Sequence, residues 1–178
     1  MKATGIVRRI DDLGRVVVPK EIRRTLRIRE GDPLEIFVDR GGEVILKKYS
    51  PLRELAKFSM EYADSLFEAT GHISCISDCD MMIAISGVPG TEYLNKMIGP
   101  DIEQVLQGRK TIHARIAEDH ALSNDYLGNN QVIAPIILQG DPLGSVMLIA
   151  KDFDTQMDDL EIKLAETAAS FLAKRIEQ

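Results

Sequence analysis

The first 53 residues consist of short runs rich in β-branched residues, most of them ended by glycine or proline. This pattern predicts strands at residues 4–10, 15–18, 34–38 and 43–49, and a short helix at residues 19–26. A segment of this length buries only about 60% of the surface of its extended chain and is marginally stable alone. We therefore expect two copies of the segment to fold together.

Charge is distributed unevenly along the chain. The first 53 residues hold thirteen Lys and Arg against eight Asp and Glu, a balance of +5, whereas the remainder holds nine against twenty, a balance of −11. A basic front segment in an acidic protein points to a polyanionic partner for that segment alone. Nucleic acid is the leading candidate. The segment contains only two aromatic residues, Phe37 and Tyr49, which argues against single-stranded nucleic acid, whose bases stack on aromatic side chains.

Two stretches of the front segment carry a family resemblance. They read TGIVRRIDDLGRVVVP at residues 4–19 and EIRRTL at residues 21–26. Together they resemble the swapped-hairpin DNA-binding domain of AbrB-type transition-state regulators over about the first 50 residues. The resemblance implies two chains that exchange hairpins, form one β-barrel dimer and bind double-stranded DNA as a transcription regulator, either an activator or a repressor.

The same resemblance implies a set of DNA-contacting residues. The arginines of the family pattern fall on Arg8, Arg15, Arg23 and Arg24, and further outer contacts fall on Lys2, Arg9 and Lys20. Arginine suits this role because its planar fork donates two hydrogen bonds to a phosphate or a guanine edge. A solvated basic face is the alternative interpretation. The pattern departs from the family at Arg27, where glycine is common after the helix, and an arginine does not easily adopt a left-handed cap.

The rest of the chain predicts an α+β domain, so the domains are residues 1–50 and 51–178. Helices are predicted at about residues 52–69, 92–98, 101–107 and 155–176, with Thr155 and Asp158 as a capping box. Strands are predicted at residues 73–77, 82–86, 111–116, 132–138 and 145–151. Residues 132–148 resemble the last hairpin of a GAF domain. That family implies an antiparallel sheet flanked by helices, which commonly binds small molecules and dimerises.

The last predicted helix has an apolar face wider than one sheet covers, which favours contact with another chain. Two different dimer contacts then predict a homotetramer. The polar segment 118–131 is long for a connection and either closes over an unidentified small effector or is a solvated loop. The sequence predicts no cofactor or metal, because His72, Cys75 and Cys79 lack a fourth ligand nearby.

Two other functions remain as alternatives. One is an antitoxin on the same front fold, although such proteins usually end in a short unstructured tail, unlike residues 52–178. The other is a thiol reductase on the GAF fold, which uses cysteines, but nothing beside Cys75 and Cys79 supplies a base. We therefore expect no enzyme. No apolar run approaches the roughly 18 residues of a membrane span, and the first ten residues lack a signal-peptide core, so we expect a cytoplasmic protein without membrane contact.

Overall fold

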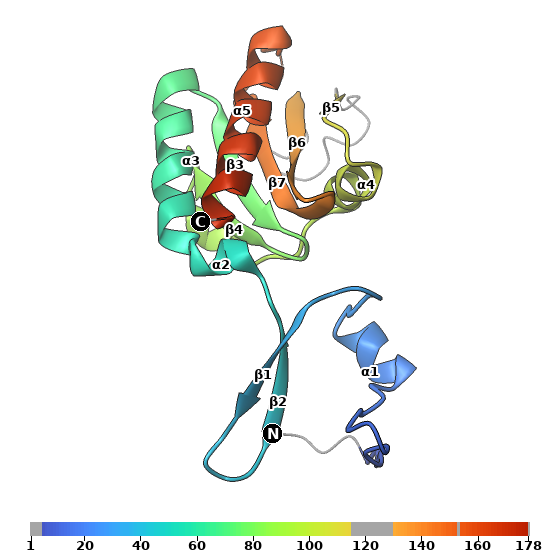
Figure 1. Cartoon of the computed structure of the whole chain (residues 1–178). Coiled ribbons are helices and arrows are strands. Elements are labelled where there is room, and N and C mark those ends of the chain that lie inside the picture. Colours follow the sequence, from blue (N-terminus) through green and yellow to red (C-terminus); the bar gives the residue numbers. More distant parts are fainter. Residues whose placement is uncertain (1–4, 115–129, 153, 178) are drawn as a thin grey trace. The chain divides into compact units, whose positions relative to one another are not determined.

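The computed structural model describes residues 5–114, 130–152 and 154–177. The chain divides into two compact units, Met1–Tyr49 and Ser50–Gln178, referred to below as the N-terminal and C-terminal units (Figure 1). The predicted contact Lys2, the end of the strand predicted at residues 111–116 and most of the segment 118–131 lie outside the described residues.

The N-terminal unit contains helix α1 (Lys20–Thr25) and one hairpin of strands β1 (Leu34–Val38) and β2 (Val44–Lys48). The two strands are antiparallel, with Ile36 opposite Leu46. Gly42 closes the turn between them with a φ of 80°, which glycine adopts without a steric penalty. The predicted hairpin and short helix are therefore confirmed.

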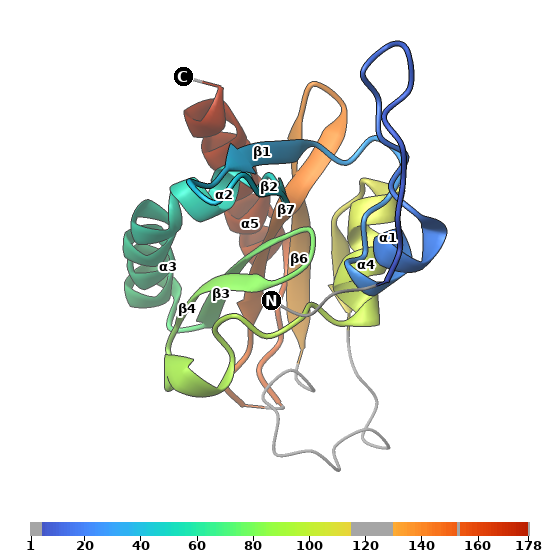
Figure 2. The same ribbon diagram turned by 90° about the horizontal axis from the view of Figure 1, so that it is seen from below.

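The strands predicted at residues 4–10 and 15–18 are not formed within one chain. Segment 5–19 doubles back at a turn in which the N–H of Asp11 donates to the carbonyl of Arg15 at 3.0 Å (Figure 2). Their β-branched residues supply the tendency to form strands, but a strand also needs a neighbouring backbone to pair with. No described residue of 5–49 is buried. The N-terminal unit therefore has no core of its own.

The C-terminal unit is built on a five-stranded antiparallel sheet of order β4-β3-β7-β6-β5. Its strands are β3 (Ile73–Asp78), β4 (Met82–Ser86), β5 (Ile112–Ala114), β6 (Gln131–Leu138) and β7 (Asp141–Ile149). A two-residue turn at Gln139 and Gly140, both with positive φ, joins β6 to β7. The expected α+β architecture is confirmed.

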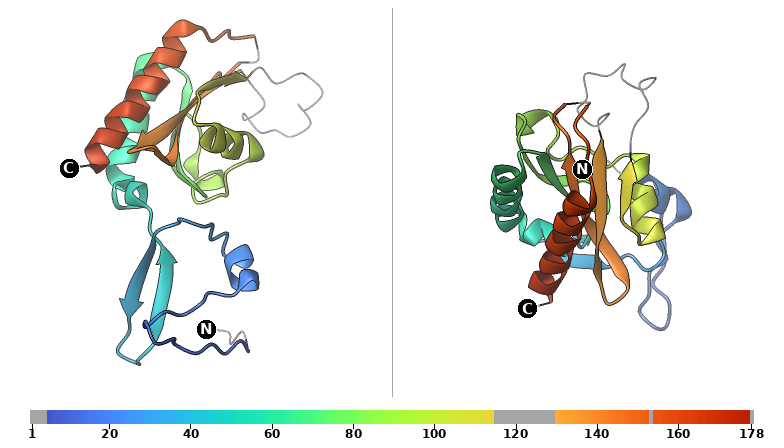
Figure 3. Two further views of the ribbon diagram at one scale, coloured as in Figure 1. Left: turned by 45° about the vertical axis from the view of Figure 1, so that its right-hand side comes forward. Right: turned by 90° about the horizontal axis from the view of Figure 1, so that it is seen from above.

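Helices cover both faces of this sheet. They are α2 (Pro51–Glu54), α3 (Ala56–Thr70), α4 (Pro100–Gly108) and α5 (Asp159–Ile176), with a 3₁₀ turn at Gly90–Glu92. Helices α3 and α5 lie side by side on one face, where a core includes Leu52, Ile76 and Leu172. Helix α4 covers the opposite face over a second core around Val105 and Met147 (Figures 2 and 3).

Three local predictions were wrong. The helix predicted at about residues 52–69 is broken at Leu55 into α2 and α3. Residues 93–98 are not helical, because the N–H of Met82 donates to the carbonyl of Lys96 at 2.9 Å and holds this segment beside β4. The capping box lies one turn later than predicted: Asp158 accepts from the N–H of Leu160 at 2.9 Å, and Glu161 accepts from the N–H of Asp158 at 2.8 Å.

Candidate nucleic-acid interface

All six described residues of the predicted DNA-contacting set are exposed. They come from three pieces of the N-terminal unit. Arg8 and Arg9 lie before the turn at residues 11–14, Arg15 follows it, and α1 carries the rest of the set, namely Lys20, Arg23 and Arg24. Exposure is what a phosphate-contacting cation requires, but it does not distinguish contact with DNA from a solvated basic face.

Asp11 organises the turn that carries Arg15. One carboxylate oxygen accepts from the N–H groups of Leu13 at 3.0 Å and Arg15 at 2.7 Å, and the other accepts from Nε of Arg15 at 2.8 Å. The backbone bond from Arg15, followed by its side-chain bond, lowers the pKa of Asp11 below its ordinary value. The turn therefore holds the guanidinium of Arg15 through its Nε, and the Arg15 side chain is 69% exposed.

Helix α1 ends in a left-handed cap at a residue that is not glycine. Arg27 has a φ of 51°. Its N–H donates to the carbonyl of Arg24 at 3.3 Å, and the N–H of Ile28 donates to the carbonyl of Arg23 at 2.8 Å. These two bonds form the Schellman motif that usually ends on glycine. The sequence analysis noted that arginine does not easily form such a cap, yet Arg27 adopts it here. The conformation costs roughly 1–2 kcal/mol in an L-residue.

Lys48 ties the end of α1 to the hairpin. Its Nζ donates to the carbonyl of Arg27 at 3.0 Å and lies 3.0 Å from a carboxylate oxygen of Asp32. Asp32 also accepts from the N–H of Arg29 at 2.8 Å. Sequence reasoning did not single out Lys48 and Asp32, because a Lys–Asp pair separated by a loop leaves no periodic signal. Together they hold the helix that carries Arg23 and Arg24.

One face of the hairpin is apolar and uncovered. The side chains that alternate onto it are exposed by 40% to 76%, and they are Ile36, Val38, Val44 and Leu46. On the other face the ammonium of Lys47 lies 4.8 Å from the ring centroid of Phe37. An apolar face of this kind in a unit without buried residues is the surface that a second chain would cover.

In the C-terminal unit, α3 and α5 carry an aromatic cluster of Phe58, Tyr62 and Phe171. The ring centroids of Tyr62 and Phe171 are 5.4 Å apart, and both rings lie 6.1 Å from Phe58. Phe171 remains 46% exposed, and Leu160 on the same helix is 60% exposed. The excess apolar width predicted for the last helix is therefore present on its surface.

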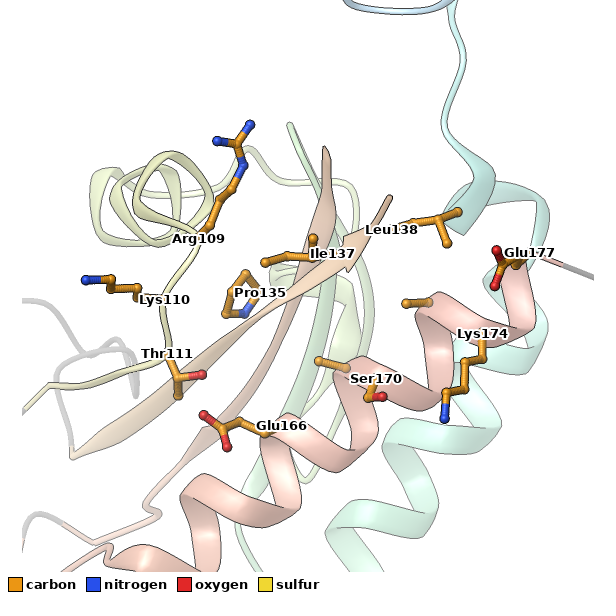
Figure 4. A pocket seen from close by; sticks show the side chains of 12 residues that line it. Arg109, Lys110, Thr111, Pro135, Ile137, Leu138, Glu166, Ser170, Lys174 and Glu177 are labelled. Atoms are coloured by element: carbon orange, nitrogen blue, oxygen red, sulfur yellow. The ribbon is translucent and has the colours of Figure 1, made fainter. Parts of the chain in front are cut away.

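A pocket of about 590 Å³ lies on the other flank of α5 (Figure 4). Strand β6 supplies its apolar floor at Pro135 and Ile137, and the hydroxyl of Thr111 and the carboxylate of Glu166 point into it. Arg109 and Lys110 line the rim but point away from the floor. Its volume falls in the range of about 300–1,000 Å³ that is typical of small-molecule sites.

The cysteines are poorly placed for catalysis. Cys75 is fully buried, and burial raises the pKa of its thiol to about 12, so that it stays protonated and weakly nucleophilic. The Sγ of Cys79 donates to the carbonyl of Pro142 at 3.1 Å. His72 lies 3.5 Å from Glu161 instead of facing a cysteine. In the part of the chain that the structure describes, no three His, Cys, Asp or Glu residues are grouped to hold a metal.

Two family models match the chain. Residues 54–177 match the model described as stage V sporulation protein T C-terminal, transcription factor. Residues 7–54 match the model described as antidote-toxin recognition MazE, bacterial antitoxin. No helix among the described residues is both long enough and apolar enough to span a membrane.

The relatives agree with this division. Stage V sporulation protein T of Bacillus subtilis (strain 168) is 55% identical over 180 residues, which cover 100% of both chains. The transition state regulatory protein AbrB of the same organism is 65% identical over 51 residues, covering 29% of this chain and 52% of AbrB. Both are regulators and not enzymes. These relatives confirm the predicted combination of an AbrB-type front segment with a GAF-like remainder. Stage V sporulation protein T has the same combination over its full length.

The fold of the C-terminal unit is that of a GAF domain. The GAF domain of an Acinetobacter phosphoenolpyruvate-protein phosphotransferase superposes with a TM-score of 0.58 at 13% identity, covering 74% of this chain and 84% of that one. This likeness concerns the fold alone. The chain belongs to the stage V sporulation protein T family of transcription factors.

Proposed function

We propose that this regulator binds double-stranded DNA in a sequence-specific manner through paired N-terminal units, with Arg8, Arg15, Arg23 and Arg24 as the principal contacts. Lys2, Arg9 and Lys20 are proposed as outer contacts to phosphates. The observation that carries the proposal is full-length identity of 55% to stage V sporulation protein T, which places this chain among sporulation-type regulators. The exposure of the four arginines and the +5 balance of the first 53 residues support it.

We propose a swapped-hairpin homodimer for the N-terminal unit. The uncovered apolar face of the hairpin and the unpaired segment 5–19 support this assembly, because a second chain would supply both a cover and strand partners. The dimer also presents two sets of arginines to one duplex. Binding of a dimer favours DNA sites with two-fold symmetry.

A salt titration of Arg24→Ala tests the DNA contact. Each phosphate contact that is lost should flatten the slope of log affinity against log salt by about 0.9. Because a dimer carries the change twice, we expect the slope to lie closer to zero by about 1.8. The measurement is fluorescence anisotropy with a duplex that the wild-type protein binds. Arg40→Ala is the matched control, since Arg40 is an exposed arginine in the turn after β1 and outside the family pattern. Equal slopes for both variants would reject the role of Arg24.

We further propose that the C-terminal units of two dimers join through α3 and α5 to form a homotetramer. The half-exposed ring of Phe171 in the aromatic cluster and the exposed Leu160 support this contact. Two pairs of N-terminal units in one particle then bind DNA at two places, and the second binding event becomes intramolecular.

Phe171→Glu should divide the tetramer into dimers. The change places a carboxylate in the centre of the proposed apolar contact, where an unpaired charge is strongly unfavourable. Light scattering is expected to give a mass of two chains of 19.8 kDa in place of four. Ser170→Glu, at an exposed neighbouring position on the pocket side of α5, should leave the tetramer intact. A wild-type protein that is already dimeric would contradict the proposed assembly.

An unidentified small-molecule effector of the GAF-like unit stays a prediction. The pocket on the flank of α5 is one place of suitable size, with an apolar floor and the polar groups of Thr111 and Glu166. We also propose a cytoplasmic location, which fits the relatives that regulate transcription. The antitoxin alternative is not favoured, because residues 54–177 match a transcription-factor domain with its own core.

A further inference from the structure

The link between the two units is very short. Strand β2 ends at Lys48, and Tyr49, the last residue of the N-terminal unit, is followed directly by Ser50 of the C-terminal unit. Ser50 is the N-cap residue of α2, a position where a serine side chain normally accepts from the first backbone N–H groups of the helix. Here it makes no such bond. Its hydroxyl instead donates to a carboxylate oxygen of Asp78 at 3.0 Å.

The carboxylate of Asp78 is shared between this link and the sheet. Nε of Arg53 donates to the same oxygen as Ser50, at 2.8 Å. The other oxygen accepts from the backbone N–H groups of Asp80 at 2.7 Å and Met81 at 2.6 Å, in the turn after β3. The Asp78 side chain is only 4% exposed, whereas that of Arg53 is 51% exposed. A buried carboxylate with four donors is a strong and directional attachment.

Apolar packing also attaches helix α2 to the sheet beside Asp78. Leu52 of α2 is fully buried, and its Cδ1 atom reaches the backbone of Gly144 on β7, opposite Asp78. A Cβ at Gly144 would lie 2.6 Å from that methyl carbon. Helix α2 is therefore held to the sheet by Leu52 on its apolar side and by Asp78 on its polar side. We name the bonds of Ser50 and Arg53 to Asp78 the Asp78 anchor.

We propose that Asp78 is a positioning residue for DNA binding: the Asp78 anchor fixes the direction in which the chain leaves the C-terminal unit and so sets the spacing of the two DNA-binding dimers in a tetramer. Asp78 itself makes no contact with DNA. The inference rests on the proposed tetramer. A loose link spreads the second DNA-binding dimer over a larger volume and lowers its effective concentration at a second site.

The substitution Asp78→Asn removes the Asp78 anchor and keeps the bonds that residue 78 accepts from the turn after β3. The amide keeps one oxygen, which can accept the N–H groups of Asp80 and Met81. Its other group is an –NH₂ donor, and it cannot accept from Ser50 or Arg53. Arg53→Gln breaks the anchor from the linker side, at a half-exposed residue, and provides a second variant if Asp78→Asn does not fold.

The experiment compares one-site and two-site DNA with the full-length protein. A duplex site is selected from a random pool with the wild-type protein and is then prepared singly and as two copies separated by whole helical turns of about 10.5 base pairs. The wild-type protein should bind the two-copy duplex at least about a hundredfold more tightly than the single copy. Asp78→Asn and Arg53→Gln should keep the single-copy affinity within about twofold of the wild-type value. Their gain in affinity from one copy to two should be about tenfold smaller than that of the wild-type protein.

Val105→Ala is the matched control. It removes buried methyl groups from the second core, on the face of the sheet covered by α4, and lowers stability without touching the anchor. It should keep the full two-copy gain. The proposal is overturned if the Asp78→Asn protein keeps that gain, or if Val105→Ala loses it equally. A wild-type protein without any two-copy gain would overturn the tetramer proposal together with the anchor.

Discussion

Replacing Arg8, Arg15, Arg23 and Arg24 together by alanine is expected to weaken binding to duplex DNA by roughly a millionfold, since about 1 kcal/mol is lost at each of the eight contacts that a dimer makes. The affinity falls without a loss of fold, because all four side chains are exposed and none belongs to a core. Fluorescence anisotropy at fixed salt measures the affinity, and circular dichroism checks the fold.

A matched control keeps this result specific. The surface contains other cations that the family pattern does not mark, and they include Arg40, Lys57, Lys163 and Lys174. Changing these four to alanine removes the same charge from each chain. We expect this control to lose far less affinity, because a guanidinium that bonds a phosphate contributes more than an exposed charge without such a contact. Equal losses in both variants would mean that net charge, and not position, determines DNA binding.

Gly144→Ala is expected to destabilise the C-terminal unit by about 3 kcal/mol or more, which is large for one methyl group. The added Cβ would lie 1.9 Å from the carbonyl oxygen of Ser77 and 3.0 Å from Cα of Asp78. Both are backbone atoms of the neighbouring strand β3, so that no side-chain rotation relieves the overlap. Strands β3 and β7 must therefore move apart at this position.

Thermal unfolding measures this effect, with an expected decrease in the melting temperature on the order of 10 °C for a chain of this size. Gly108→Ala is the matched control, because nothing lies within 4 Å of its Cβ position and its φ is not positive. That change lies at the end of α4 and should leave stability unchanged or raise it by about 0.4–1 kcal/mol. A melting temperature for Gly144→Ala equal to that of the wild-type protein would show that the strands adapt at little cost.

Local patterns predicted most of the secondary structure. Strand β4 was predicted at its observed residues, and the hairpin β6–β7 was expected from the resemblance of residues 132–148 to the last hairpin of a GAF domain. The error at residues 93–98 arose because their apolar spacing suits a helix, whereas backbone bonds to β4 hold them extended. The capping box was misplaced because Thr155 and Asp158 each precede an acidic residue by three positions. Only the geometry distinguishes the two candidates.

Pairing between segments was harder to predict. The β-branched residues at 4–10 and 15–18 indicate a strand tendency, but sequence does not reveal whether the partner lies in the same chain. The candidate DNA contacts were found through the family resemblance, and the structure adds that those described are exposed. Asp78 resembles any turn aspartate in the sequence. Its bonds to Ser50 and Arg53 span 28 and 25 residues, and no local pattern announces such a contact.

The salt dependence of DNA binding by the wild-type protein and by the variant with alanine at positions 8, 15, 23 and 24 gives the most direct test of an arginine grip on duplex DNA. Four arginines from each of two chains contribute about −7 to the wild-type slope of log affinity against log salt if all contact phosphates, and the outer contacts add to it. The variant should give a slope closer to zero by several units. Parallel lines of equal affinity for the two proteins would contradict DNA binding through these arginines.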